Sequence, residues 1–240
     1  MRILSLHPGT TELLFALGAG DMLVGRSEDS LYPAAATKIP SVWDTVDDVM
    51  VDVFEPELVL LGPGQGDLIG DKYEKVLFDP QSIDMIYEQI LDLGERLGKQ
   101  VEADMIVHDI RSAIAQVSEK ATKFHPVRVY CEVHHNDTVA SSGYVSELLQ
   151  LAGGTPFQGQ VNVEAVQAFD PQMIISCVPG EDEYNVELLE GREGWQGLNA
   201  VKYERVFNVQ GDMLHRPGPR LVQGIKRLAK ILHGVTINGP

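Results

Sequence analysis

Two histidines follow predicted strands and are the side chains of this chain best suited to bind a metal-containing ligand. His7 follows the apolar residues 3–6, and His215 lies in the loop after residues 205–209. A neutral imidazole binds late transition metals, so each ring could give an axial bond to the metal of a tetrapyrrole. Hydrogen bonding is about as common a role for an isolated histidine. We therefore treat His7 and His215 as ligand-binding residues, and as possible axial ligands only.

A second histidine group lies near the middle of the chain, where His134 and His135 stand next to Asn136 and Asp137. Adjacent side chains at the end of a strand point in different directions, so a shared metal ion would need a kinked backbone. A polar loop is the more common structure for such a pair. We keep His134 as a ligand-binding candidate and predict no metal site at this loop.

Motifs of the common enzyme classes are missing. The sequence has no glycine-rich phosphate loop followed by a suitable helix, no Gly-x-Ser-x-Gly elbow and no His-Glu-x-x-His pair. Residues 62–66 look superficially like a phosphate cradle, but no helix with Lys-Ser or Lys-Thr follows them. Cys131 and Cys177 are too few for a zinc site; free buried thiols are expected, and a disulfide is possible. We predict a binding protein rather than an enzyme.

A long helical segment near the middle of the chain organises the rest. Apolar residues recur at steps of three and four from Ile83 to Leu97, Gly98 interrupts the pattern, and it resumes from Ala103 to Val117. A helix of about 22 residues is about 33 Å long, enough to span a small domain. We predict a lobe at residues 1–98, an interlobe helix at 99–123 and a second lobe at 124–240.

The sequences on either side of that helix resemble each other. Residues 54–60, Phe-Glu-Pro-Glu-Leu-Val-Leu, match residues 169–175, Phe-Asp-Pro-Gln-Met-Ile-Ile, and residues 12–18 match residues 147–153. A chance echo is the alternative, since proline before a strand is common. Apolar runs separated by helices are typical of parallel sheets covered on both faces. We predict an α/β fold of two similar lobes, each a mostly parallel sheet flanked by helices, joined by one long rigid α-helix.

Ligands of open parallel sheets bind beyond the carboxyl ends of the strands. If the two lobes face each other, the loops at these ends line one cleft. Trp43 ends a predicted strand, where its ring could form the wall of a pocket for a large planar ligand, although core packing is the usual role of tryptophan. The predicted ligand-binding residues are His7, Pro8, Gly9, Glu28, Tyr32, Trp43, Gln65, His134, Tyr144, His215 and Arg216.

The charge of the chain limits its partners. The formal net charge is −16, and no basic stretch is present for phosphate contacts. Nucleic acid is therefore excluded, and an anionic membrane surface is disfavoured. No apolar run approaches the roughly 20 residues of a membrane span, so direct membrane insertion is not expected. The first residues lack the features of a signal sequence, so we expect a cytoplasmic protein as written, or a periplasmic or cell-surface one if a signal was removed.

Segments along nearly the whole chain follow one recognisable order. Residues 2–12, Arg-Ile-Leu-Ser-Leu-His-Pro-Gly-Thr-Thr-Glu, open it. The later segments are residues 14–18, 21–26, 32–33, 56–60, 147–149, 152–154, 216–224, 228–229 and 231–233. Together they resemble the cobalamin- and iron-siderophore-binding proteins of ABC importers. Residues 216–220, Arg-Pro-Gly-Pro-Arg, and residues 27–32 look closest to the cobalamin-binding branch.

This resemblance implies a binding protein whose two lobes close slightly on a ligand and deliver it to a membrane permease. It implies a corrinoid, a cobalamin-like molecule, as the ligand, and no intrinsic cofactor. The family often places a glutamate on each lobe to dock onto permease arginines. Glu164 fits that place in the second lobe, and the first lobe offers Asp48 at the corresponding position.

Three functions stay open. The first is capture of a corrinoid between the lobes for ABC-type import, which predicts that Trp43→Ala weakens corrinoid binding. The second exchanges the ligand for a ferric siderophore, haem or a metal ion; highly anionic siderophores usually need several cations, and the predicted cleft offers mainly Arg26, Arg216 and Arg220. The third is a cytoplasmic corrinoid-handling protein or enzyme.

Overall fold

The computed structural model describes residues 1–42, 46–67, 69–133, 140–141, 143–159, 161–178 and 186–236. Trp43 and His134 therefore lie outside the described residues. Two compact units are present: unit 1 holds residues 1–108 and 216–219, and unit 2 holds residues 109–215 and 220–240. The 22-residue helix α4 (Gln100–Ala121) contributes residues to both units.

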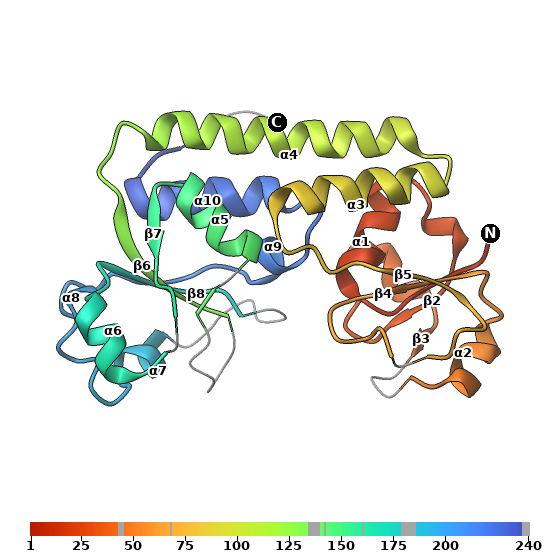
Figure 1. The fold of residues 1–240 in the computed structure, drawn as a ribbon, viewed down its shortest axis with the longest axis horizontal. Helices are drawn as coiled ribbons and strands as arrows, with labels where there is room; N and C mark the ends of the chain where they lie inside the picture. The colour runs from red at the N-terminus through yellow and green to blue at the C-terminus, as the bar shows by residue number, and fades with distance from the viewer. Residues whose placement is uncertain are drawn as a thin grey trace. The chain divides into compact units, whose positions relative to one another are not determined.

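Among the described residues, unit 1 contains a parallel sheet with strand order β3-β2-β1-β4-β5 (Figure 1). Its strands are β1 (Ile3–Ser5), β2 (Leu23–Ser27), β3 (Ser41–Val42), β4 (Leu58–Leu61) and β5 (Glu74–Leu77). Every residue of β4 is buried, as expected for a parallel strand whose two faces are both covered by helices. The carboxyl ends of these strands share one edge, which is where β1 delivers His7.

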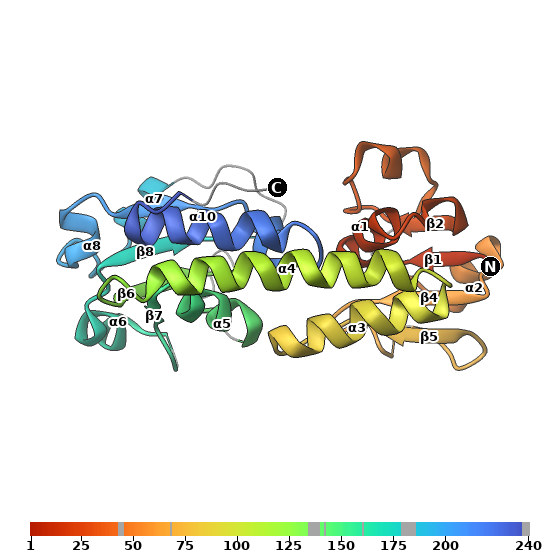
Figure 2. The same cartoon turned by 90° about the horizontal axis from the view of Figure 1, so that it is seen from above.

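Helices cover both faces of this sheet. Helix α2 (Asp48–Phe54) packs on one face through Val51, against Leu4 and Val59 of the strands. The other face carries α1 (Pro8–Ala16) and α3 (Ile83–Arg96) (Figure 1). Helix α3 lies beside the first turns of α4 (Figure 2), and the contact is so close that a side chain at Gly94 would collide with Ala103. Two 3-10 helices, Gly20–Met22 and Ala34–Lys38, flank β2.

Unit 2 contains a second parallel sheet, which has the strand order β7-β6-β8-β9 in the described residues. Its strands are β6 (Val127–Glu132), β7 (Gly154–Pro156), β8 (Met173–Ser176) and β9 (Val206–Asn208). Its helices are α5 (Gly143–Leu151), α6 (Val163–Phe169), α7 (Val186–Glu190), α8 (Asn199–Lys202), α9 (Asp212–His215) and α10 (Leu221–His233). Tyr130, Ile174 and Val206 point from neighbouring strands into a core under α6 and α8 that encloses Trp195. Helices α5 and α10 lie on the other face (Figures 1 and 2).

The two units repeat one local structure. Helices α2 and α6 each have seven residues and end at a residue in the left-handed conformation, Glu55 (φ 45°) and Asp170 (φ 47°). Asp47 and Asn162 cap their N-termini by accepting a hydrogen bond from a backbone N–H of the first turn.

The carboxyl ends of the same two helices are also held alike. The guanidinium of Arg2 donates to the carbonyls of Phe54 and Glu55, and that of Arg128 donates to the carbonyls of Phe169 and Asp170. Such bonds satisfy the last carbonyls of a helix, which have no partner within the helix itself. The predicted fold of two similar parallel α/β lobes is confirmed.

Among the described residues, no helix is both long enough and apolar enough to cross a membrane.

Candidate functional site

His7 stands at the carboxyl end of β1 and caps helix α1. Its Nδ1 accepts a hydrogen bond from the backbone N–H of Gly9 at 3.2 Å. Pro8 occupies the first helical position, where a missing N–H has no cost, because the first N–H groups of a helix have no partner within it. The predicted neighbours His7, Pro8 and Gly9 therefore form one helix N-terminus at the carboxyl edge of the sheet, the edge at which open parallel sheets generally bind ligands.

The ring of His7 is neutral at physiological pH. Burial, with a smaller contribution from the charge of Arg216, lowers the pKa of His7 to about 4. Because Nδ1 accepts a hydrogen bond, the neutral ring carries its proton on Nε2. His7 therefore offers an Nε2–H donor to a ligand. For Nε2 to bind a metal, the proton would have to move to Nδ1 and the bond from Gly9 would have to break.

The loop after β4 is fixed against the same ring. A side chain at Gly62 would collide with Cβ, Cγ and Cδ2 of His7. Gln65 accepts a hydrogen bond from the N–H of Gly62 at 2.7 Å and donates one to the carbonyl of Leu6 at 2.9 Å. The carboxamide of Gln65 thus joins this loop to the end of β1. The ligand contact predicted for Gln65 stays a prediction.

Gly62→Ala is expected to displace the His7 ring and to lower the free energy of unfolding by about 1–3 kcal/mol, because the added methyl has no space. Urea denaturation measures the change. Gly66→Ala in the same loop is the matched control, since no atom lies within 4 Å of the added group, and it should change the free energy of unfolding by less than about 0.5 kcal/mol. Equal effects of the two substitutions would contradict the packing of His7 on Gly62.

A chain of hydroxyl groups supports α1 from beneath. The hydroxyl of Thr11 lies 2.8 Å from that of Ser5 and 2.9 Å from that of Ser30, so it donates to one and accepts from the other, and the Ser5 hydroxyl lies 2.7 Å from that of Thr10. Ser30 in turn lies 2.6 Å from the hydroxyl of Ser27. These contacts join β1, α1 and the loop after β2. They fix the position of this loop, which carries Glu28 and Tyr32, relative to the end of β1.

Arg26 is one of the cations predicted for the cleft, but its guanidinium is hydrogen-bonded to backbone carbonyls of its own unit. Its guanidinium is buried and donates to the carbonyls of Ala36, Ser27 and Glu28, each at 2.9 Å. Three charge-assisted bonds of this kind shape the loop after β2. The side chain of Glu28 is exposed, and that of Tyr32 is 47% exposed.

Arg216 lies near the end of the sequence but packs beside His7 and Gly9 in unit 1. Residues 216–219 belong to unit 1, and the Cα of Arg216 lies 3.6 Å from the position of a Cβ on Gly9. The side chain of Arg216 is buried, and its charge acts on His7. Unit 1 therefore gathers His7, Pro8, Gly9, Gln65 and Arg216 around the end of β1.

Unit 2 places His215 beside two thiols. The Sγ atoms of Cys131 and Cys177 are 3.1 Å apart, and the Cys177 Sγ is 3.5 Å from Nε2 of His215. Both cysteines are free and buried. The contact with Cys131 and then burial raise the pKa of the Cys177 thiol, so Cys177 stays protonated. Tyr144, in the first turn of α5, is partly buried.

A buried ion pair occupies the end of β6, and sequence reasoning missed it. The carboxylate of Glu132 is fully buried and accepts hydrogen bonds from Arg192 at 2.6 and 2.9 Å and from the hydroxyl of Tyr130 at 3.2 Å. Burial is the main reason that the pKa of Tyr130 is raised. The Arg192 guanidinium also lies 4.5 Å from the ring of Trp195. An acidic residue within the predicted apolar run 127–133 was the available signal, because a buried carboxylate needs a partner.

Metal ligation stays a prediction for His7 and His215. Within the described ranges, no group of three or more histidine, cysteine or acidic side chains is arranged to hold a metal ion. The two histidines belong to different units.

Comparison with known proteins gives a consistent picture. The model of the periplasmic binding protein family matches residues 3–212. The uncharacterized ABC transporter substrate-binding lipoprotein YvrC of Bacillus subtilis is 29% identical, over 97% of this chain and 80% of its own length. The vitamin B12-binding protein of Vibrio cholerae is 26% identical, over 96% of this chain and 88% of its own length.

Solved structures share the fold at lower identity. The periplasmic vitamin B12-binding protein BtuF of Vibrio cholerae superposes with a TM-score of 0.76 at 23% identity, covering 96% of this chain and 95% of that one. A periplasmic haem-binding protein of Pseudomonas aeruginosa gives a TM-score of 0.79 at 19% identity, covering 98% and 94%. Because proteins with different ligands share this fold, the choice of ligand rests on the site residues.

Proposed function

Because the chain belongs to the periplasmic binding protein family, we propose that it captures a corrinoid, a cobalamin-like molecule, for import by an ABC-type transporter. Proteins of this family bind small molecules and present them to permease subunits. They are substrate-binding proteins rather than enzymes. The choice of a corrinoid among their ligands is our inference.

The observation that supports this choice is that two of the three predicted cleft arginines already have partners within the protein. Arg26 donates its hydrogen bonds to three carbonyls of its own loop, and Arg220 is paired with Asp212 at 3.7 Å. Two of the three cations predicted for the cleft are therefore occupied by the protein. A highly anionic ferric siderophore would need such cations, whereas a nearly neutral corrinoid does not. The 26% identity with a vitamin B12-binding protein over 96% of the chain supports the same choice.

Unit 1 offers contacts suited to a corrinoid. The Nε2–H of neutral His7 donates to an amide carbonyl of the ligand, and the exposed ring of Tyr32 supplies an aromatic surface for the macrocycle. Because Nδ1 is held by Gly9, we infer that His7 binds by hydrogen bonding rather than as an axial ligand of cobalt. Trp43 stays a predicted ligand contact.

Permease docking is proposed for two short helices. Glu164 is exposed in the first turn of α6. Asp48, at the start of the equivalent helix α2, accepts a hydrogen bond from the N–H of Gly70 at 2.7 Å. We propose that Glu164 pairs with a permease arginine and that Asp48 makes a weaker contact. We infer from such a role that the protein works outside the cytoplasm, and one of its relatives is a lipoprotein.

The proposal is tested by mixing the purified protein with aquocobalamin or cyanocobalamin, desalting it and recording the visible spectrum of the protein fraction. Stoichiometric colour with both forms, and no band shift specific to aquocobalamin, is the expected result. A shift for the aquo form alone would identify a histidine on cobalt. A colourless fraction would exclude the corrinoid, and haemin and a ferric hydroxamate are the next probes.

Tyr32→Ala is expected to weaken cyanocobalamin binding about tenfold, because an aromatic contact is lost. Calorimetry measures the dissociation constant. Tyr203→Ala is the matched control: Tyr203 is 68% exposed and lies before the amino end of β9, at the edge opposite to the expected ligand site. Equal dissociation constants for the Tyr32→Ala variant and the unaltered chain would remove Tyr32 from the site.

A further inference from the structure

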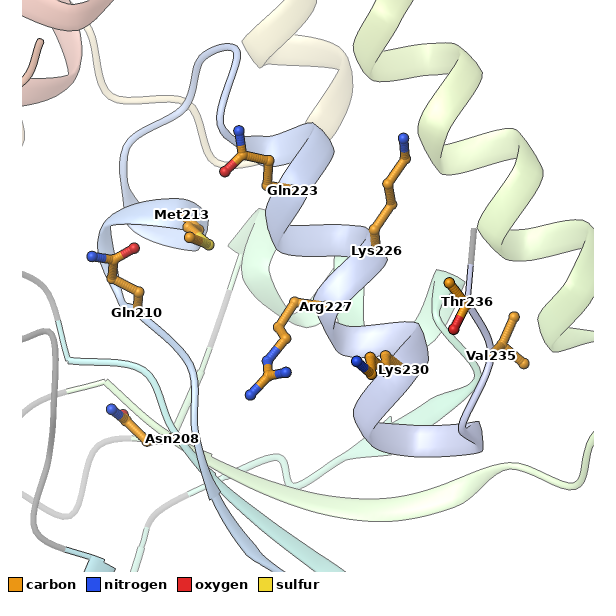
Figure 3. A pocket seen from close by; sticks show the side chains of 9 residues that line it. All are labelled: Asn208, Gln210, Met213, Gln223, Lys226, Arg227, Lys230, Val235 and Thr236. Atoms are coloured by element: carbon orange, nitrogen blue, oxygen red, sulfur yellow. The ribbon is translucent and has the colours of Figure 1, made fainter. Parts of the chain in front are cut away.

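A cavity of about 650 Å³ opens in unit 2 beside helix α10, and none of the site residues described above lines it (Figure 3). Such a volume is within the range of small-molecule sites, roughly 300–1,000 Å³. Helix α10 forms one side, and the end of β9 with the following loop forms another. The residues used below are Asn208, Gln210, Gln223, Lys226, Arg227 and Lys230.

The cavity is basic in a strongly acidic protein. The chain has 19 basic and 35 acidic residues, yet each ionisable side chain among the described residues that line the cavity is a cation. In the part of the chain that the structure describes, Arg227 and Lys230 have no carboxylate partner. Asp212, next to the lining residue Met213, is paired with Arg220. The positive charges of Arg227 and Lys230 are therefore not neutralised by a carboxylate of the described residues.

A solvated helix face explains only part of this pattern. Basic residues near the carboxyl end of a helix interact favourably with its dipole, which accounts for Lys230 in the last turn of α10. Lys226 and Arg227 lie a turn earlier, where that effect is small. Asn208 and Gln210, which belong to β9 and the loop after it, line the same cavity (Figure 3). Helix electrostatics does not explain the position of Arg227.

We propose that this cavity binds a small anion carrying phosphate groups. The guanidinium fork of Arg227 matches two phosphate oxygens, and the ammonium group of Lys230 adds a point charge. These two positive charges suit a phosphate or diphosphate group, whose other oxygens can accept a hydrogen bond from the amide of Gln223. Lys120 donates to the carbonyl of Thr236 at 3.3 Å and so fixes the segment that forms the remaining wall. This site is independent of corrinoid capture.

Titration with sodium pyrophosphate at constant ionic strength tests the proposal by calorimetry. The unaltered chain should bind one equivalent saturably. The double variant Arg227→Gln/Lys230→Gln should bind at least tenfold more weakly. The matched control Lys123→Gln/Lys202→Gln removes the same charge from exposed positions of unit 2 and should bind as the unaltered chain does. Arg227→Lys keeps the charge but loses the fork, and an intermediate affinity is expected.

The phosphate could belong to a soluble molecule or to a lipid headgroup, and a second arm separates the two. Sedimentation with phosphatidylglycerol vesicles, against phosphatidylcholine vesicles, measures headgroup binding. Saturable pyrophosphate binding that depends on Arg227 and Lys230 supports a soluble ligand. Binding to phosphatidylglycerol alone, with the same dependence, supports a headgroup. The proposal is overturned if neither probe binds, or if the double variant binds as tightly as the control.

Discussion

Arg192→Met is expected to lower the free energy of unfolding by about 3 kcal/mol, because it leaves the buried carboxylate of Glu132 without its cation. Methionine keeps a similar aliphatic stem but lacks the guanidinium that lies 4.5 Å from the ring of Trp195, so a cation–π contact is lost together with the ion pair. The hydroxyl of Tyr130 still donates to Glu132 and offsets only a small part of this loss. Urea denaturation at pH 7 measures the effect.

Two further variants test whether the large loss of stability is specific to a buried ion pair, as opposed to one on the surface. Arg96 pairs with Asp92 and Glu74 on the surface, so Arg96→Met should cost less than about 1 kcal/mol. The double variant Glu132→Gln/Arg192→Met removes the unpaired charge and should recover part of the lost stability. If Arg192→Met were no more harmful than Arg96→Met, the carboxylate of Glu132 would not depend on this partner.

The Glu132–Arg192 pair also bears on the site. Glu132 is the last residue of β6, at the sheet edge where parallel strands present groups to ligands. Its carboxylate is bound by Arg192 and Tyr130, so it serves to hold residues 191–198 over the core around Trp195. An acidic residue at a strand end is therefore part of the scaffold here.

Sequence periodicity predicted the long helices because they follow one rule over many residues. Ile83, Ile86, Ile90 and Leu93 are all buried, and Gly98 takes the left-handed conformation that ends α3. In α4 the stripe is shifted slightly: Val107 is buried, whereas Ile106 is only half-buried. The match of residues 54–60 with 169–175 predicted the repeat because it includes the helix end, the left-handed residue and the strand start in both units.

Short elements at the sheet edges were missed for a physical reason. Strand β5 has only four residues, Glu-Lys-Val-Leu, and its place depends on pairing with β4 through backbone bonds. Strand β7 includes a glycine and a proline, both poor strand formers, yet it pairs with β6. Helix α9 occupies four residues of the predicted loop after β9. Pairing with a distant partner, not local pattern, decides such segments.

The site could be predicted only in part. The position of His7 follows from the end of β1, but its neutrality depends on burial and on Arg216, which lies more than 200 residues away in the sequence. Arg26 looked like a cleft cation because sequence does not show that three carbonyls surround it. Position along a strand is readable from a sequence, whereas the partners of a charged group are not.

The second large effect concerns His7 and pH. Because its pKa is about 4 in the folded chain and about 6.5 when exposed, the unfolded chain binds a proton more readily. The contribution of neutral His7 to stability is therefore present above about pH 6.5 and is lost as the pH falls towards 4. A shift of this size corresponds to about 3 kcal/mol of unfolding free energy. Urea denaturation at intervals between pH 7 and pH 4 measures the loss.

Many carboxylates also titrate in this range, so the comparison needs a variant that removes only His7. His7→Asn keeps an oxygen that can accept the bond from Gly9, since asparagine is a good helix cap, but it does not titrate. Its stability should fall by about 3 kcal/mol less than that of the unaltered chain between pH 7 and pH 4. Arg216→Gln should remove the smaller part of this difference, because burial is the larger cause of the lowered pKa of His7. Parallel curves for the His7→Asn variant and the unaltered chain would show that His7 is not the neutral donor on which the proposed ligand contact depends.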